Sequence, residues 1–521
     1  MTAAGPPAGV TLSEIVATLS LVSDLGMGRP VERVLRQTVI AMRLAQRAGC
    51  DDSVRSATYY TSLLTWIGCA TDTSDLAELF GDEVALYADT HEGDLAGMSM
   101  AVFMVRHLGR GSSPIRRLSM RSQFLGTAGR SVQNVMMAHC QSAGALAGRL
   151  GLGDDVSQPL VQAFERWDGR GVPGAVGADD LAMAARLVQL ADFVEAFHFA
   201  AGPEAALDVA RKKRGTHFDP ALVDVFCAQS GDILRDLDGV STWDEVIALD
   251  PRLGLELSPH DLDRALEAIA DYADLKSPSR TGHSRGVADI AAGAATALGM
   301  DHDAVTSLRR AALVHDVGMI GVPSAVWEET RTWSVSQRER ARTHPYLLER
   351  MLAQTPLLND IAHSASMHHE RLDGSGYPRG LRREAIPLAG RILAVADVVQ
   401  ALGQARPYRP ALDAEEAIRV LEDQVRAGRL DGDVVHAVRQ NADGIRRRRI
   451  ELPGGLTKRE AEVLVSLARG RTNRQIAEDL SISRKTVSSH LEHVYAKLGI
   501  STRTEAALFA MEHGLAGLPR D

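Results

Sequence analysis

Cysteine and aromatic residues are scarce in this 521-residue chain. It has four cysteines, all in the first half and with no Cys-x-x-Cys pair among them. The simplest interpretation is reduced, buried thiols in a cytosolic protein at Cys50, Cys69, Cys140 and Cys227. Aromatic residues make up only 4% of the chain. With alanine and leucine abundant, this composition favours helices over sheets.

Long apolar runs are also missing. No stretch of about 18 uncharged apolar residues occurs, so the sequence predicts no membrane span. Residues 1–7 have neither the basic segment nor the apolar core of a signal peptide, and we therefore expect a cytoplasmic protein. The length predicts three or four domains, each large enough to bury its own core.

The net charge of −9 is unevenly distributed. Residues 444–521 contain 14 Lys or Arg against 9 Asp or Glu, which leaves −14 on the residues before them. An acidic body with a basic tail is what a nucleic-acid-binding terminus would need.

Amphipathic helices are predicted along almost the whole chain. Apolar residues recur at three- and four-residue spacing in 12–25, 31–48, 53–67, 182–199 and 414–427. Residues 231–258 are expected to be irregular. Turn motifs follow at 168–173 and 373–378.

These two turn motifs belong to an internal repeat. Residues 164–173 align with 369–378 at an offset of 205, and the same offset places His139 on His344. Further pairs are 190–194 with 395–399, and 64–68 with 314–318. The chain therefore contains two copies of one helical unit, roughly residues 10–228 and 260–443.

The copies differ in their chemistry. The first has Thr65-Trp66 where the second has His315-Asp316, and Ala163-Phe164 where the second has His368-His369. Neither Trp nor Phe offers a lone pair for coordination, so we expect no metal site in the first copy. Dimerisation, ligand sensing and scaffolding stay open as its roles. Its remaining polar residues are interpreted as caps or satisfied core groups: His139, Asp168 and Asp192.

Metal-ligand residue types gather in the second copy. Single buried histidines are usually structural, but here several fall in one helical domain: His283, His315, Asp316, His344, His368, His369 and Asp397. Imidazole and carboxylate together suit Fe, Mn or Zn better than Mg or Ca. An Asp directly beside a ligating His can bridge two ions with its two oxygens.

The motifs of this span resemble those of HD-GYP domains, a branch of the HD superfamily of metal-dependent phosphohydrolases that hydrolyse cyclic di-GMP. The resemblance rests on 282–284, 315–318, 343–345, 368–378, 396–398 and 406–409, and on the spacing from His283 to His315. It covers about a third of the chain.

The resemblance implies two divalent transition metal ions, Fe or Mn, and a cyclic dinucleotide as partner. His283, His315, Asp316 and Asp397 would surround one ion, and His344, His368 and His369 the other, with Asp316 as the bridge. Two such ions would lower the pKa of a water for in-line attack on a phosphodiester. Arg406 and Arg409 would neutralise phosphate oxygens, Tyr377 would shape the loop over guanine, and pGpG or GMP would be the products.

Three positions depart from the family pattern. Met319 stands where the family usually has Lys, and Ser279 stands where trinuclear members carry Glu. A Phe-Asp-Pro element is missing from 428–433, although the first copy keeps it at 218–220. Two functions stay open: hydrolysis of a cyclic dinucleotide, or its retention without cleavage as a signal.

Residues 456–515 predict a helix-turn-helix. A capping box from Thr457 to Glu460 starts one helix, which ends at Gly470. Helices are then expected at 473–480, 484–498 and 503–513, with Ser483 as an N-cap. Two helices joined by a three-residue turn match helix-turn-helix geometry. The expected inward stripe is Ile476, Ala477, Leu480, Val487, Leu491 and Val494.

This segment resembles the LuxR-type DNA-binding domain. The resemblance implies double-stranded DNA as partner and a homodimer joined through 503–513. Base edges would be read by Ser488, Ser489 and Glu492, and phosphates bound by Lys485, Thr486 and Lys497.

The sequence thus predicts an all-α chain of two tandem HD-like domains and a four-helix LuxR-type domain. The expected boundaries are 1–228, 229–443, a linker at 444–455, and 456–521. The expected function is DNA-binding transcriptional regulation through a cyclic-dinucleotide module.

Overall fold

The computed structural model describes residues 9–70, 136–237, 242–252, 254–445 and 452–515. These residues form helices and turns, with only isolated bridges and no strand among them, which confirms the all-α prediction. Two compact units are present, one over Gly9–Ala265 and the other from Leu266 onward. No described helix is long and apolar enough to span a membrane.

The first unit is built on α2, which is buried along almost its whole length and packs against α3 and α9. The side chain of Asp51 accepts from the amide of Val54 and starts α3. The elements are α1 (Leu12–Gly26), α2 (Arg33–Arg47), α3 (Asp52–Leu64), η1 (Ile67–Ala70), α8 (Asp154–Val161), η2 (Ala178–Asp180), α9 (Met183–Ala201), α10 (Pro203–Lys213), α11 (Pro220–Ile233) and α12 (Thr242–Ala248), and residues 136–149 are also helical.

Two expectations for this unit need correction. The stretch 231–258 is not irregular throughout, because α12 forms where Trp243 and Val246 bury their side chains. Of the cysteines whose side chains are described, only Cys140 is buried, whereas Cys50 and Cys227 are partly exposed; all three are free thiols.

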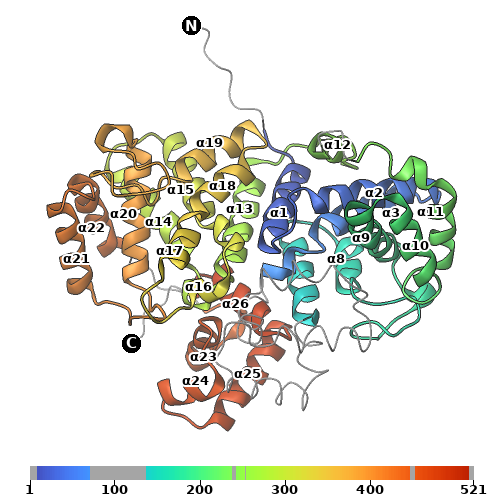
Figure 1. Ribbon diagram of the computed structural model, residues 1–521. Coiled ribbons are helices and arrows are strands. Elements are labelled where there is room, and N and C mark those ends of the chain that lie inside the picture. Colours follow the sequence, from blue (N-terminus) through green and yellow to red (C-terminus); the bar gives the residue numbers. More distant parts are fainter. Residues whose placement is uncertain (1–8, 71–135, 238–241, 253, 446–451, 516–521) are drawn as a thin grey trace, which may run out of the picture. The chain divides into compact units, whose positions relative to one another are not determined.

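The second unit packs α14 against α15, α20 and α22 (Figure 1). Asp301 caps α15 and Thr355 caps α19 through their side chains. The elements are α13 (Pro259–Asp274), which begins before the unit boundary, η3 (Pro278–Arg280), α14 (His283–Ala297), α15 (His302–Val314), η4 (Val317–Gly321), α16 (Ser324–Trp327), α17 (Val335–Arg342), α18 (His344–Leu352), α19 (Pro356–Ala365), η5 (Arg383–Ala385), α20 (Leu388–Leu402), α21 (Ala414–Arg426) and α22 (Gly432–Ile445).

The same local architecture recurs in both units. Glu32 and Gly282, at φ 72° and 73°, precede α2 and α14. A second pair is Glu165 and Glu370: each is buried and accepts two or more hydrogen bonds from backbone amides of the loop that follows it. These pairs stand at the offsets of the sequence repeat, and they support the predicted duplication.

The C-terminal segment forms four helices, as predicted. They are α23 (Lys458–Ala468), α24 (Asn473–Asp479), α25 (Arg484–Leu498) and α26 (Arg503–Glu512), preceded by η6 (Pro453–Gly455). Thr457 and Glu460 form the expected capping box, and Ser483 caps α25. The predicted inward stripe is buried except for Leu480, which is partly buried.

Candidate metal centre and DNA-reading helix

The seven expected metal ligands converge in the second unit. They come from helix ends and one helix interior: His283 begins α14, His315 follows α15, and His344 begins α18. Asp397 lies within α20. Three groups of three potential ligand atoms lie within 4.8 Å of one another: His344 with His368 and His369, His283 with His315 and Asp397, and His315 with Asp316 and His368.

The two oxygens of Asp316 face different pairs of imidazoles. Its Oδ2 lies 3.6 Å from Nε2 of His283 and 3.3 Å from Nε2 of His315. Its Oδ1 lies 3.4 Å from Nε2 of His344 and 3.7 Å from Nε2 of His368. One carboxylate can therefore serve two cation positions at once.

Asp397 divides its oxygens in a similar way. Its Oδ1 lies 3.2 Å from Nε2 of His283 and 4.0 Å from Nε2 of His315. Its Oδ2 lies 3.9 Å from Nδ1 of His369. His369 thus faces the other oxygen of this carboxylate, with Nδ1 rather than Nε2.

The outward nitrogens of the imidazoles are anchored by oxygen atoms. Nδ1 of His315, His344 and His368 donates to a carbonyl three residues earlier, at 2.7, 2.5 and 2.7 Å. Nδ1 of His283 lies 2.9 Å from Oε1 of Gln404. Such partners fix the tautomer and leave Nε2 as the bare ligand atom.

The bare Nε2 atoms fit a cation. Those of His344 and His368 lie 3.0 Å apart, and with both protons on Nδ1 their lone pairs face each other. The buried Nε2 of His315 lies 3.3 Å from Oδ2 of Asp316 without a hydrogen bond that satisfies it. Because facing lone pairs in a buried site are costly, this arrangement is the one expected of a ligand set for metal ions.

The protonation states suit metal binding, which needs neutral imidazoles and ionised carboxylates. Burial lowers the pKa of His283 to about 4 and that of His368 to about 3. Burial opposes ionisation of Asp316, but Arg280 and His315 hold its pKa well below the usual range. His315 is the exception: burial acts to lower its pKa, yet the Asp316 carboxylate raises it to about 9, so a metal would have to displace that proton.

The other predicted catalytic residues differ in their surroundings. Arg406 lies at the site, donates to the carbonyl of Ser279 at 3.1 Å, and is 3.3 Å from Nδ1 of His283. The guanidinium of Arg409 instead donates to four backbone carbonyls at and beyond the end of α20. The ring of Tyr377 stacks on that of His369, with centroids 4.6 Å apart.

Three neighbours of the site had not been predicted from the sequence. Arg280 forms an ion pair with Oδ2 of Asp316, Gln404 orients His283, and Trp327 packs edge-on against His344. None belongs to a recognised motif. The only signal was position, since Arg280 lies three residues before His283.

The first unit replaces the cation site with an arginine. Arg33, the counterpart of His283, pairs with Asp192 and Glu195. The indole nitrogen of Trp66 donates to the same Asp192 at 3.1 Å, and Nε2 of His139 lies 2.7 Å from the carbonyl of Thr65. Within the described residues, all three potential metal-holding groups belong to the second unit.

The predicted DNA contacts lie on and beside α25. The side chains of Lys485, Thr486, Ser488, Ser489, Glu492 and Lys497 are all exposed. The ammonium of Lys497 is engaged, however, at 2.7 Å from the carboxylate of Glu460 and 3.2 Å from the carbonyl of Gly455.

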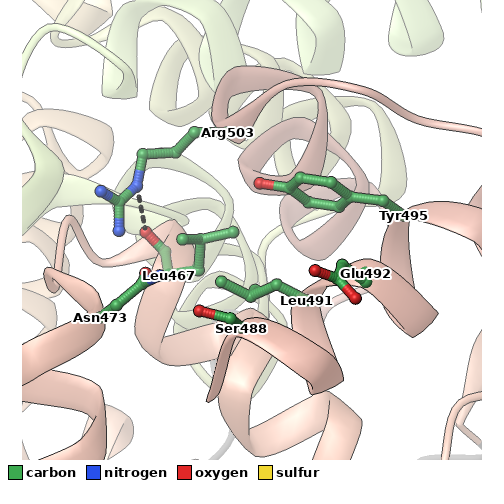
Figure 2. Close-up of a pocket in the computed structure, with 7 residues that line it drawn as sticks. All are labelled: Leu467, Asn473, Ser488, Leu491, Glu492, Tyr495 and Arg503. Carbon is green, nitrogen blue, oxygen red and sulfur yellow. Dashed lines mark hydrogen bonds between the residues drawn. The ribbon is translucent and has the colours of Figure 1, made fainter. Parts of the chain in front are cut away.

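A surface hollow of about 330 Å³ adjoins this helix (Figure 2). Ser488 and Glu492 line it from α25, together with Asn473 of α24 and Arg503 of α26. Arg503 is turned toward the end of α23, where its Nε donates to the carbonyl of Leu467 at 3.4 Å. Two of the predicted base-reading side chains therefore share one accessible recess.

Comparison with known families assigns both regions. Residues 267–434 match the HD domain family, and residues 455–510 match the family of bacterial regulatory proteins of luxR type. The chain therefore contains an HD domain followed by a C-terminal LuxR-type domain. A LuxR-type domain implies DNA binding.

Similar proteins include phosphodiesterases of cyclic dinucleotides. The chain is 28% identical over 419 residues to the 3'3'-cGAMP-specific phosphodiesterase 3 of Vibrio cholerae, covering 80% of this chain and 91% of that protein. It is 36% identical over 178 residues to phosphodiesterase 1 of the same specificity and organism, covering 33% of this chain and 40% of the relative. It is also 35% identical over 159 residues to a cyclic di-GMP phosphodiesterase of Thermotoga maritima, covering 30% and 42%.

The fold has a solved counterpart. The crystal structure of a cyclic GMP-AMP specific phosphodiesterase of Vibrio cholerae superimposes with a TM-score of 0.57 at 24% identity, over 85% of this chain and 99% of that one. The HD-domain chain therefore shares the fold of that protein over most of its length.

Proposed function

We propose that the second unit is a two-metal phosphodiesterase acting on a guanine-containing cyclic dinucleotide, and that its nucleotide state governs DNA binding by the LuxR-type domain. The observation that carries this proposal is Asp316, whose two oxygens each face a separate pair of imidazole nitrogens. Residues carrying out DNA reading would be those exposed on α25.

The chain's own residues have defined parts in this proposal. Divalent ions, Fe or Mn by the imidazole-rich donor set, would supply Lewis-acid polarisation of the phosphodiester and an activated water. Arg406 would bind a phosphate oxygen, and Tyr377 would shape the loop over the base. Arg409 would act by ordering the turn at 406–409, because backbone carbonyls occupy its guanidinium.

The reaction would be hydrolysis of one phosphodiester. A water oxygen forms a bond to phosphorus, the bond from phosphorus to the ribose 3′ oxygen breaks, and that oxygen takes up a proton. The product is a linear dinucleotide with a 5′ phosphate, and a second hydrolysis gives mononucleotides.

Product analysis tests this function. The full chain, loaded with Mn²⁺ or Fe²⁺ under reducing conditions, would be incubated with cyclic di-GMP and with 3′3′-cGAMP, beside Asp316→Ala. We expect linear product from the native chain and a loss of at least about 1000-fold in Asp316→Ala, since both ions lose a ligand. Intact nucleotide in the presence of bound metal would rule out hydrolysis of these two substrates.

Met319 favours a second candidate, a nucleotide sensor without turnover. Its side chain is 1% exposed and packs in an apolar cluster, so it offers no charge to a phosphate. A sensor would bind the nucleotide unchanged and alter DNA affinity, whereas the enzyme would lose the effect as substrate disappears. Measuring DNA affinity over time after one addition of nucleotide separates the two.

A further inference from the structure

Met319 supplies no positive charge to the candidate site. Met319 packs with Val322, Val326, Trp327 and Ala341, and nothing in this cluster carries a charge. The positive charge that a transferring phosphoryl group needs must come from a neighbouring residue.

The indole of Trp327 connects this position to Arg280. Its ring nitrogen donates to the carbonyl of Met319 at 3.4 Å. The guanidinium carbon of Arg280 lies 5.5 Å from the centroid of the Trp327 ring, a distance that permits a cation–π contact. Trp327 therefore contacts both Arg280 and Met319.

The guanidinium of Arg280 forms an ion pair with Asp316, the carboxylate between the imidazoles of the ligand set. Its Nη1 donates to Oδ2 of Asp316, and the side chain is only 16% exposed. Arg406 lies on the same rim and donates to the carbonyl of Ser279, next to Arg280 in the chain. Two guanidiniums thus stand beside the two carboxylates Asp316 and Asp397.

Metal binding changes what Arg280 can pair with. If divalent ions were bound to Asp316, the guanidinium would lose its ion pair with that carboxylate, and a largely buried cation that has lost such a partner is costly. A phosphodiester brings that anion into the site. Guanidinium also suits phosphate geometry, because it can donate two parallel hydrogen bonds.

We infer that Arg280 binds a non-bridging oxygen of the substrate phosphodiester and supplies the positive charge that the Met319 position lacks. This inference rests on the proposed function. It assigns a catalytic role to a residue outside every motif that identified the site. The competing account is that Arg280 only neutralises Asp316 in the metal-free protein.

The test compares Arg280→Met and Arg280→Lys with the native chain. Arg419→Met serves as control, because that arginine is 65% exposed on α21. We would measure metal content and metal affinity, nucleotide binding by calorimetry, and kcat/KM on cyclic di-GMP and 3′3′-cGAMP. We expect Arg280→Met to keep its metal and lose about 100-fold in kcat/KM. Arg280→Lys keeps a point charge but lacks the paired donors of guanidinium, so its kcat/KM should lie between those of the native chain and Arg280→Met.

Two results would overturn the inference. One is unchanged kcat/KM in Arg280→Met together with tighter metal binding, which identifies a mere counter-ion. The other is loss of metal from both Arg280 variants, which identifies a structural support. If Arg280→Met does not fold, as judged by its circular dichroism, Arg280→Lys decides the same question.

Failure of the proposed function has a separate signature. If the native, metal-loaded chain cleaves neither nucleotide, hydrolysis is refuted, and calorimetry still reports on Arg280. Nucleotide affinity at least about tenfold weaker in Arg280→Met would then uphold the phosphate contact. Equal affinity, or no binding by the native chain, would overturn it.

Discussion

Gln404 holds the ring of His283 in place, because its amide oxygen lies 2.9 Å from Nδ1. We predict that Gln404→Leu lowers metal affinity about 10- to 100-fold without unfolding the domain, since partners of this kind orient a ligating imidazole. Titration of the metal-free protein with Mn²⁺ measures the change. Gln440→Leu, an exposed site on α22, provides the control and should bind metal as the native chain does.

His139 makes the stability of the first unit depend on pH. Burial lowers its pKa to about 4, against roughly 6.5 in the unfolded chain. The unfolded state therefore binds more protons between these values, and the stability this group contributes is complete above pH 6.5 and is lost as pH falls toward 4. We predict that the free energy of unfolding falls by about 2 kcal/mol less in His139→Gln than in the native chain when the pH is lowered from 7.5 to 5.

Urea unfolding followed by tryptophan fluorescence at both pH values measures this difference. Other groups titrate in the same range, so the comparison is between the two proteins rather than within one. An equal loss in native and variant chains would show that His139 is protonated without cost to the fold.

Sequence reasoning found the residues that converge at the candidate metal centre but not their supports. The ligands stand in short runs such as His315-Asp316 and His368-His369, whose residue types and spacing indicate chemistry directly. Arg280, Gln404 and Trp327 act through contacts between segments that are far apart in the chain. No local pattern encodes such contacts.

At the scale of elements, the loop after α19 depends on one close approach. A Cβ at Gly376 would lie 2.4 Å from the amide nitrogen of Arg371 and 2.5 Å from the carbonyl oxygen of His369. We predict that Gly376→Ala lowers the free energy of unfolding by about 3 kcal/mol and displaces Tyr377 from the ring of His369, because backbone atoms cannot yield as side chains do.

Unfolding midpoints and metal content measure this effect. Gly403→Ala is the control, since its new Cβ would meet neighbours only at 3.8 Å, an ordinary contact. A change below about 0.5 kcal/mol is expected there. Equal stability of the two variants would show that the loop can shift to accept a side chain.

Helix ends were the most predictable elements. The expected helix at 484–498 is observed at Arg484–Leu498, and the one at 12–25 at Leu12–Gly26. Capping side chains such as Ser483 act within three residues, so the information lies in the local sequence. The helix α12 was missed because its stability comes from burial of Trp243 and Val246, a tertiary effect.

At the scale of the whole molecule, the two units differ in what occupies the place of His283. The first has Arg33 within its own chain, whereas the second has a ligand set suited to metal from solution. We predict that chelation speeds hydrogen exchange at least about tenfold in α14, α15 and α18, since bound metal stabilises only the state that binds it. Exchange in α2 and α9 should not change.

Hydrogen exchange with peptide-level mass spectrometry, with and without chelator, makes this comparison in the full chain. Arg33→Met supplies the converse case: exchange in α2 should rise whether or not chelator is present, because Asp192 loses its ion pair with Arg33 and only Arg36 remains paired with Glu195. A chelator response in both units would place a metal requirement in the first.

Three imidazoles of the second unit are fixed by carbonyls only three residues earlier in the chain. The orientation of each ring is thus set by its own helix end. The entropy of orienting His315, His344 and His368 is lost during folding and not again at capture of the ion. We therefore expect metal uptake to be fast and to need no reorientation of these three rings, while the ion pair between Arg280 and Asp316 is the contact that must open.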